Sequence, residues 1–335
     1  MQTQAPELEL PLACLPGTAA PRRGAAAGFP GEPSLPIASI PAASTVTHRF
    51  ADYLELSKPR MNFLVLVTTA VGYFMAGGGA RLLADRLLLL HTLLGSALAA
   101  AGASVLNQYL ERHFDALMLR TRNRPLPAGR IGAGEALLLG LFVGTLGVLE
   151  LGFFVNWLTG ALAAFTLLSY VLAYTPMKRR TTLCTIVGAV PGAIPIMMGW
   201  TAVRNGIGPE AIVLFGILFL WQMPHFLAIA ILYRDDYARG GFRMLPVVDS
   251  QPHLRSTGRQ IVMYAVALLP ITLLPVRLGM AGPVYFVAAA VLGLGFIGFG
   301  VMCALTPRRP QARQLFLASI TYLPMLLGAM MIDKI

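Results

Sequence analysis

From Pro59 to its end, the chain alternates long apolar segments with short polar ones. Each apolar segment is close to the ~20 residues that an α-helix needs to cross ~30 Å of hydrocarbon. The pattern therefore predicts an all-α, polytopic membrane protein, a bundle of nine transmembrane helices. These helices are expected at residues 59–78, 88–108, 134–152, 156–174, 183–203, 211–232, 260–279, 283–304 and 314–332.

The fifth segment, residues 183–203, contains Pro191, Pro195 and three glycines. Membrane helices tolerate proline and glycine where neighbouring helices satisfy the freed backbone groups or approach closely. The segment is therefore either kinked or closely packed, or it simply shows the ordinary glycine and proline usage of membrane helices. The two interpretations are equally open.

Composition and charge agree with this class. Of 335 residues, 56% are hydrophobic and only 12% are charged, which excludes an ordinary soluble domain. The net charge of +11 would also suit a nucleic-acid-binding protein, but 21 of the 26 Lys and Arg residues lie before or at the start of the first segment or follow an even-numbered one. Cytoplasmic loops are enriched in Lys and Arg. We therefore expect no nucleic-acid partner, a cytoplasmic N-terminus and a periplasmic C-terminus.

Two regions are expected along the chain. Residues 1–50 are rich in Pro, Ala and Gly without a sustained period, which predicts a disordered cytoplasmic tail. Residues 51–335 form the transmembrane domain, entered through a short polar lead from Ala51 to Lys58. The three cysteines form no CxxC pair, so neither a disulfide framework nor a zinc site is indicated.

The most informative polar stretch follows the second apolar segment. Asn107, Glu111 and Asp115 recur at steps of four, so on a helix they share one face over ~12 Å. Such oxygen donors suit Mg²⁺, which often sits between carboxylates and a substrate phosphate. Arg120 and Arg124 follow, and a guanidinium donates in a planar fork to phosphate oxygens. The alternative is a cytoplasmic loop that merely obeys charge bias, but that bias does not call for acids.

Two further polar motifs are expected on the same side. At the end of the fourth segment, Tyr174, Lys178 and Arg179 offer a hydroxyl and two cations to a phosphate, although a basic cluster there also signals topology. After the sixth segment, Asp235 and Asp236 are candidate ligands of a second metal, or part of a solvated loop.

One histidine stands apart from these motifs. His225 lies eleven residues before Asp236, about three helical turns or ~16 Å deeper. A buried imidazole there is a candidate base or axial ligand, but a packed core histidine is an equally good interpretation.

Together, these motifs indicate a particular chemistry. A diphosphate is held at the water boundary while its apolar chain lies in the bundle. Mg²⁺ and the cations stabilise the charge that develops on the leaving diphosphate. The allylic cation then reacts in a cavity that excludes water, so the acceptor is expected to be lipophilic too.

The chain resembles the intramembrane prenyltransferases, and within them closely the members that farnesylate heme. The resemblance covers essentially residues 50–335, and its most specific parts are Arg120 to Leu126 and Trp221 to Phe226. Its other motifs are Leu56 to Arg60, Asn107 to Asp115, Tyr174 to Arg179, Asp236 with Tyr237, and Met244 to Val248.

The resemblance implies nine helices around a central cavity that opens to the cytoplasm. It also implies transfer of farnesyl from farnesyl diphosphate to a vinyl group of heme b, with water added, to make heme O for terminal oxidases. Heme b is then a substrate and not a prosthetic group. Heme A synthase or oxidase assembly factors become candidate partners, and a bacterial inner membrane is favoured over a mitochondrial one.

Carried over by position, the resemblance assigns a role to each motif. The acidic face would bind Mg²⁺-diphosphate, the Arg and Lys residues would clamp phosphate, and His225 would serve the heme side. Two positions depart from the family pattern. The second acidic motif is reduced to Asp235 and Asp236, and His113 stands where relatives more often carry an acid.

Three alternatives remain. A prenyltransferase for a quinone precursor or a chlorophyllide would share most motifs. A secondary transporter predicts broken helices and ionisable groups near the bilayer midplane, whereas most acids here lie at one boundary. A structural heme-binding subunit would need spaced histidines deep in facing helices, and only His225 qualifies.

Overall fold

The computed structural model describes residues 46–77 and 86–335. Within these ranges nine helices are long and apolar enough to cross a membrane, which confirms the predicted fold class. The spans are α2 (Pro59–Gly77), α3 (Arg86–Asp115), α4 (Ala133–Phe154), α5 with η1 and α6 (Trp157–Met177), α7 (Cys184–Arg204), α8 (Pro209–Leu232), η2 with α11 (Pro252–Arg277), α12 (Pro283–Leu305) and α13 (Arg309–Ile332). The composite spans divide into α5 (Trp157–Leu168), η1 (Ser169–Tyr174), α6 (Thr175–Met177), η2 (Pro252–Leu254) and α11 (Arg255–Arg277).

Helix α3 is longer than its apolar segment predicts. It continues for 30 residues and ends at Asp115, beyond the expected end at residue 108. At 1.5 Å per residue it measures about 45 Å, more than the hydrocarbon thickness of a bilayer, so its last turns carry polar side chains out of the apolar layer.

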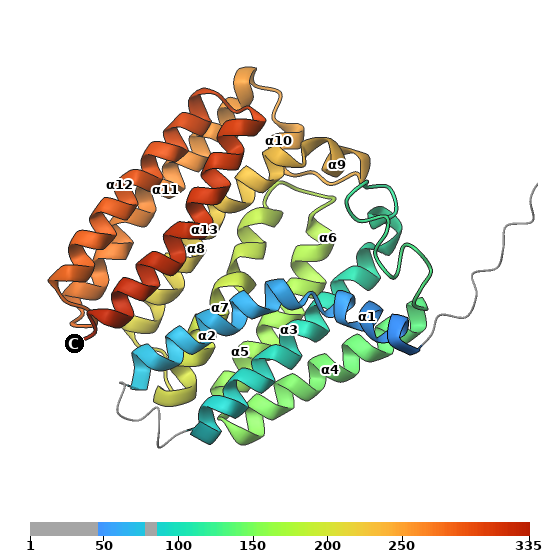
Figure 1. Cartoon of the computed structure of the whole chain (residues 1–335), viewed down its shortest axis with the longest axis horizontal. Helices are drawn as coiled ribbons and strands as arrows, with labels where there is room; N and C mark the ends of the chain where they lie inside the picture. Colours follow the sequence, from blue (N-terminus) through green and yellow to red (C-terminus); the bar gives the residue numbers. More distant parts are fainter. Residues whose placement is uncertain (1–45, 78–85) are drawn as a thin grey trace, which may run out of the picture. The chain divides into compact units, whose positions relative to one another are not determined.

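The helices form two groups joined by a central pair. Figure 1 shows α8, α11, α12 and α13 on one flank and α3, α4 and α5 on the other, with α2 and α7 between them. Helix α7 is the centre of the packing, because 72% of its apolar window is buried, the largest share among the nine spans.

Glycines let α2 and α7 touch backbone to backbone. A Cβ atom on Gly72 would overlap the carbonyl oxygen of Ile196, and one on Gly199 would overlap that of Thr69. Small residues at such positions are a common way to pack membrane helices. Helix α7 runs without a break through its two prolines. Of the two interpretations of this segment, close packing is therefore the one that the structure supports.

A further helix, α1 (Val46–Ser57), precedes the first span. The sequence indicated only a tail up to residue 50 and a polar lead from Ala51. Residues 1–45 of that tail lie outside the described residues, and residues 46–50 begin α1. Arg130 fixes the helix through Asp52 at 2.8 Å and Glu55 at 3.1 Å. Leu56 is completely buried.

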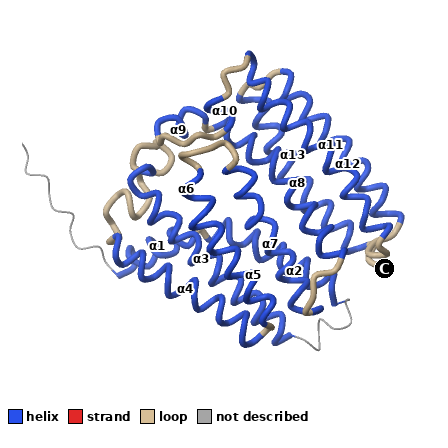
Figure 2. The backbone as a smooth tube through the Cα atoms, turned by 180° about the vertical axis from the view of Figure 1, so that it is seen from behind, coloured by secondary structure: helices blue, strands red, loops and turns tan. Residues whose placement is uncertain are grey.

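The polar connections gather at one end of the bundle. Figure 2 shows loops around α6 and two short helices, α9 (Arg234–Arg239) and α10 (Leu245–Val248), at the end of the bundle where α3 finishes. The three motifs that the sequence singled out therefore share one end, as the alternation of loops along the chain requires.

Candidate functional site

The last turns of α3 present a buried row of oxygen atoms. Asn107, Glu111 and Asp115 are 1%, 5% and 1% exposed, and all three lie on one continuous helix. The expected shared face is therefore a face turned into the protein. Burying two carboxylates is costly unless each has a partner of opposite charge.

Three cations from three different segments contact this row, and two of them pair with its carboxylates. They arrive from the α1–α2 junction, from the loop after α3, and from the residue after α6. The contacts are Lys58 Nζ to Asn107 Oδ1 at 3.2 Å, Arg124 Nη1 to Asp115 Oδ2 at 2.8 Å, and Lys178 Nζ to Glu111 Oε1 at 2.8 Å. Asn107 also donates to Thr175 Oγ1 at 3.0 Å, which ties α3 to α6.

Lys58 is a residue that sequence reasoning quoted but gave no role. Its backbone is left-handed, with φ 50°, where the chain turns from α1 into α2. Gln108 helps to fix this turn, because its amide donates to the carbonyl oxygen of Leu56 at 2.7 Å. The only signal in the sequence was its place in the motif Leu56 to Arg60, and nothing local indicates a contact with Asn107, 49 residues away.

The surroundings of Lys58 and Lys178 shift the pKa of their ammonium groups in opposite directions. Burial, together with the nearby positive charges of Arg124 and Lys178, lowers the pKa of Lys58 to about 7. Burial also disfavours the charged form of Lys178, but Glu111 outweighs it and holds the pKa of Lys178 well above its ordinary value. An anion bound among these cations would favour the charged form of Lys58.

The remaining predicted phosphate ligands lie around this cluster. The Lys178 ammonium lies 4.6 Å from the ring centroid of Tyr174. The guanidinium of Arg179 lies 3.9 Å from the ring of Phe114, and that of Arg120 lies 5.0 Å from the ring of Tyr233. Within the described residues neither Arg179 nor Arg120 forms an ion pair, but Arg120 lies close enough to Asp236 for its positive charge to lower the pKa of that carboxyl.

A cavity of about 430 Å³ opens beside the cluster. Glu111, Arg179 and Arg180 supply its charges, and Phe114 and Phe242 supply apolar walls. It combines an acid, two cations and aromatic rings. The central cavity implied by the family resemblance stays a prediction.

The adjacent acids of the second motif point to different places. Asp236 is buried, pairs with Arg239, and accepts from the backbone N–H of Leu119 at 3.1 Å. Burial raises its pKa, but these hydrogen bonds outweigh burial and hold the pKa below its ordinary value. Asp235 is 70% exposed and pairs with Arg309 at 3.0 Å. The structure thus brings Asp236 to the loop after α3 and leaves Asp235 on the surface.

His225 lies on α8 and packs against α13. Its ring stacks against Trp221 and against Phe316, each at 5.1 Å between centroids. Its Nδ1 lies 2.7 Å from Ser319 Oγ on α13. Sequence reasoning missed Ser319 and Phe316, because they are more than 90 residues away and carry no motif of their own.

The oxygen atoms of the α3 row suit a hard metal ion. Among the described residues no group of three His, Cys, Asp or Glu side chains comes together. The row on α3 offers two carboxylates and one amide, which are hard oxygen donors. Mg²⁺ commonly takes one or two carboxylates and completes its shell with waters and phosphate oxygens, so these residues fit it.

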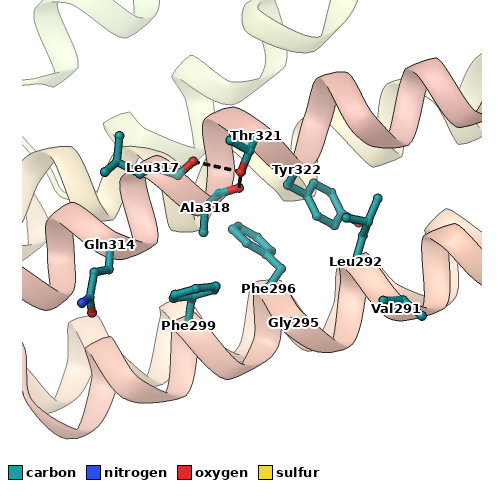
Figure 3. Close-up of a pocket in the computed structure, with 10 residues that line it drawn as sticks. All are labelled: Val291, Leu292, Gly295, Phe296, Phe299, Gln314, Leu317, Ala318, Thr321 and Tyr322. Atoms are coloured by element: carbon teal, nitrogen blue, oxygen red, sulfur yellow. Dashed lines mark hydrogen bonds between the residues drawn. The ribbon is translucent and has the colours of Figure 1, made fainter.

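A second hollow, also of about 430 Å³, lies between α12 and α13. Figure 3 shows Phe296, Phe299 and Tyr322 lining it, and Thr321 turning its hydroxyl back to the backbone of α13. Its lining contains no Asp, Glu, Lys or Arg. It is therefore an apolar groove and not a candidate for binding a diphosphate.

Known proteins resemble this chain in sequence and in fold. The model of the UbiA prenyltransferase family matches residues 65–323. The protoheme IX farnesyltransferase of Solibacter usitatus is 49% identical over 289 residues, covering 84% of this chain and 98% of its own. A solved digeranylgeranylglyceryl phosphate synthase has a TM-score of 0.72 at 18% identity, over 85% of this chain and 98% of its own.

A UbiA homolog from Archaeoglobus fulgidus, solved with GPP and Mg²⁺, has a TM-score of 0.59 at 15% identity, over 83% of this chain and 99% of its own. At these identities the solved structures establish the fold alone. The family match and the sequence relative establish membership, so the chain belongs to the UbiA prenyltransferase family and is a membrane prenyltransferase.

Proposed function

We propose that the protein transfers a farnesyl group from farnesyl diphosphate to a vinyl group of heme b, with Mg²⁺ as cofactor, to give heme O. The observation that carries this proposal is the buried acidic row of α3 facing cations from three separate segments. Support for the acceptor comes from the relative named protoheme IX farnesyltransferase. Support for the metal comes from the archaeal homologue that binds GPP and Mg²⁺.

The diphosphate would lie where acids and cations meet. Lys58, Arg124 and Lys178 already stand within hydrogen-bond distance of the α3 side chains, so a bound metal diphosphate would meet both signs of charge in one place. Arg179 and Arg120 extend the positive field. Asn107, Glu111 and Asp115 would hold Mg²⁺, which would neutralise charge on the leaving diphosphate. Asp236 is a candidate ligand of a second metal. The surface position of Asp235 argues against Asp235 as a ligand of that metal.

The reaction itself is balanced by one water molecule. The allylic C–O bond breaks and its electron pair stays on the diphosphate oxygen. The π electrons of the vinyl group form the new C–C bond to the allylic carbon, and water adds to the resulting cation and releases a proton. The chain's cations stabilise the leaving group, and its apolar walls keep other water from the allylic cation.

His225 is proposed to serve the acceptor. It lies on α8 between two aromatic rings, and α8 also carries the motif Trp221 to Phe226. A flat, apolar, aromatic surface suits a porphyrin. A quinone precursor or a chlorophyllide is the second candidate acceptor, because the residues proposed to bind the diphosphate do not depend on which acceptor is used.

The cellular setting follows from the same proposal. The protein is an integral membrane protein, and relatives from bacteria favour the bacterial inner membrane. The basic loops favour a cytoplasmic N-terminus and a periplasmic C-terminus. Heme O supplies heme A biosynthesis and terminal oxidases, so heme A synthase and oxidase assembly factors are the candidate partners.

The acceptor is the part to test first. The full chain, purified in detergent, is incubated with Mg²⁺, farnesyl diphosphate and equal concentrations of heme b, 4-hydroxybenzoate and chlorophyllide, and products are identified by mass. We expect farnesylated, hydrated heme alone, and none after chelation of Mg²⁺. Transfer to either of the other acceptors with heme b unchanged would overturn the proposal.

A further inference from the structure

The contacts of His225 determine where its proton resides. Ser319 Oγ lies 2.6 Å from the carbonyl oxygen of Phe316 and 2.7 Å from His225 Nδ1. Both separations are hydrogen-bond distances, and each bond requires one hydrogen between its two heavy atoms. Without a hydrogen, two oxygen atoms at 2.6 Å would repel each other.

Counting the available hydrogens gives one arrangement. A serine hydroxyl carries one hydrogen, and a backbone carbonyl carries none. The hydroxyl hydrogen must lie between Ser319 Oγ and the Phe316 oxygen. The hydrogen between Ser319 Oγ and His225 therefore belongs to the imidazole, so Nδ1 is the protonated nitrogen.

The other ring nitrogen is then defined by elimination. A neutral imidazole that carries its hydrogen on Nδ1 has a lone pair on Nε2. Among the described residues Nε2 has no hydrogen-bond partner, yet it is not among the polar atoms that are sealed from solvent without one. No carboxylate contacts this ring in the described part of the chain, so nothing there favours a second proton. Nε2 is thus an accessible acceptor.

The ring is also held in orientation. Stacking against Trp221 and Phe316 fixes the plane of the imidazole ring. The hydrogen bond to Ser319 fixes the direction in which Nδ1 points within that plane. Trp221 is itself anchored on the same residue, because its Nε1 donates to the backbone oxygen of Ser319 at 2.9 Å. One residue of α13 therefore orients two side chains of α8. In metal sites the partner of the second imidazole nitrogen sets tautomer and direction in this way.

We propose that Ser319 is a positioning residue that keeps the proton of His225 on Nδ1 and presents the Nε2 lone pair to the iron of the heme substrate. The proposal rests on the proposed function, in which His225 serves the heme side. It adds that Nε2 is the atom of His225 that faces the substrate, and that Ser319 keeps this atom unprotonated.

Ser319→Ala tests the hydroxyl alone. The substitution keeps the backbone oxygen that Trp221 uses and removes one buried atom. Thr321→Ala is the matched control. Thr321 also lies on α13 and bonds its own helix backbone, but it faces the apolar groove between α12 and α13.

The tautomer is measured first, without any ligand. Protein labelled with ¹⁵N-histidine is studied by NMR, and the signals of His225 are identified by their loss in His225→Gln. We expect Nδ1 to be protonated in the original chain and in Thr321→Ala, and the proton to redistribute toward Nε2 in Ser319→Ala. A proton on Nε2 in the original chain, or an unchanged tautomer in Ser319→Ala, would overturn the role of Ser319 whatever the acceptor is.

Hemin binding is measured second, by the absorption spectrum of added hemin. We expect a spectrum of imidazole-ligated iron that is lost in His225→Ala, and hemin binding weaker by roughly 10-fold in Ser319→Ala. Mg²⁺-dependent binding of farnesyl diphosphate should be unchanged in both variants. If Ser319→Ala binds hemin as tightly as the original chain, only the role of Ser319 fails. If the original chain binds no hemin, both the role of Ser319 and the proposal that heme b is the acceptor are overturned.

Discussion

Glu111 and Lys178 are both buried, and each is the main charge partner of the other. Removing one partner of such a pair leaves an uncompensated charge and costs ~3–5 kcal/mol, whereas replacing both costs much less. The pair therefore allows structural and functional roles to be separated.

We predict that Lys178→Gln lowers the thermal unfolding temperature in detergent and weakens binding of farnesyl diphosphate. Glu111→Gln combined with Lys178→Gln should recover most of the unfolding temperature but not the binding. Arg122→Gln, an exposed arginine of the neighbouring loop, should change neither. Recovery of binding in the double variant would show that Lys178 does not contact the phosphate.

At the residue scale the sequence predicted types of side chain better than their partners. The spacing of Asn107, Glu111 and Asp115 was enough to place them on one face, because helical geometry is local. The contact of Lys58 with Asn107 depends on how α1 and α2 meet, which no local pattern encodes. For the same reason nothing in the sequence distinguished buried Asp236 from exposed Asp235.

At the scale of the elements, too, the sequence predicted what depends on local pattern and missed what depends on packing. Nine spans could be predicted because apolar length alone defines them. The apolar segment ends before helix α3 does, because the last turns of α3 are polar. Helix α1 was missed because it has only twelve residues, and so short an amphipathic pattern is a weak signal next to a membrane span. The sequence left the role of the prolines and glycines of α7 open. In the structure Gly199 faces the backbone of α2, Gly188 faces Tyr174 and Gly192 faces Gln222, so the packed neighbours explain these glycines.

The contact between α2 and α7 gives a prediction. In Gly199→Val the new side chain would overlap the Thr69 carbonyl, so α2 must move, and we expect a loss of roughly 1–3 kcal/mol or more in stability. Gly298→Val on α12 is the control, because a Cβ atom there meets nothing within 4 Å. The measurement is the unfolding temperature in detergent, and equal values for the two variants would contradict this view of the helix pair.

The start of α11 gives a prediction about pH. Asp249 accepts from the backbone N–H and the hydroxyl of Thr257, both at 2.8 Å. Burial raises the pKa of Asp249, but these bonds outweigh burial and hold it below its ordinary value. A lowered pKa in the folded state stabilises the protein above the unfolded-state pKa of ~4, and this stabilisation is lost as the pH falls through the folded-state pKa.

Asp249→Asn should therefore cost about 1 kcal/mol at pH 7. The gap in unfolding temperature between the original chain and the variant should narrow as the pH falls below about 4. Both proteins are followed by thermal unfolding in detergent from pH 7 to pH 3. A gap that stays constant over this range would show that the charge of Asp249 contributes nothing.

At the scale of the whole molecule, charge distribution and fold agree. The motifs that the sequence placed on one side of a membrane do gather at one end of the bundle (Figure 2). What no sequence pattern could supply is the convergence of three segments on α3, because it requires all the helices to be packed.

The orientation of the bundle is tested by fusions at the C-terminus. We expect alkaline phosphatase fused after Ile335 to be active in a bacterial host and green fluorescent protein at the same point to be dark, because the first folds in the periplasm and the second in the cytoplasm. The reverse result would place the diphosphate site on the periplasmic side.

The most direct test of the α3 site is the binding of a non-reactive farnesyl thiodiphosphate by calorimetry, with and without Mg²⁺. We predict Mg²⁺-dependent binding to the original chain and to Glu210→Gln, a carboxylate change at the start of α8, and a loss of at least ~10-fold in Asp115→Asn. Asp115→Asn binding the analogue with unchanged affinity and unchanged Mg²⁺ dependence would contradict the account.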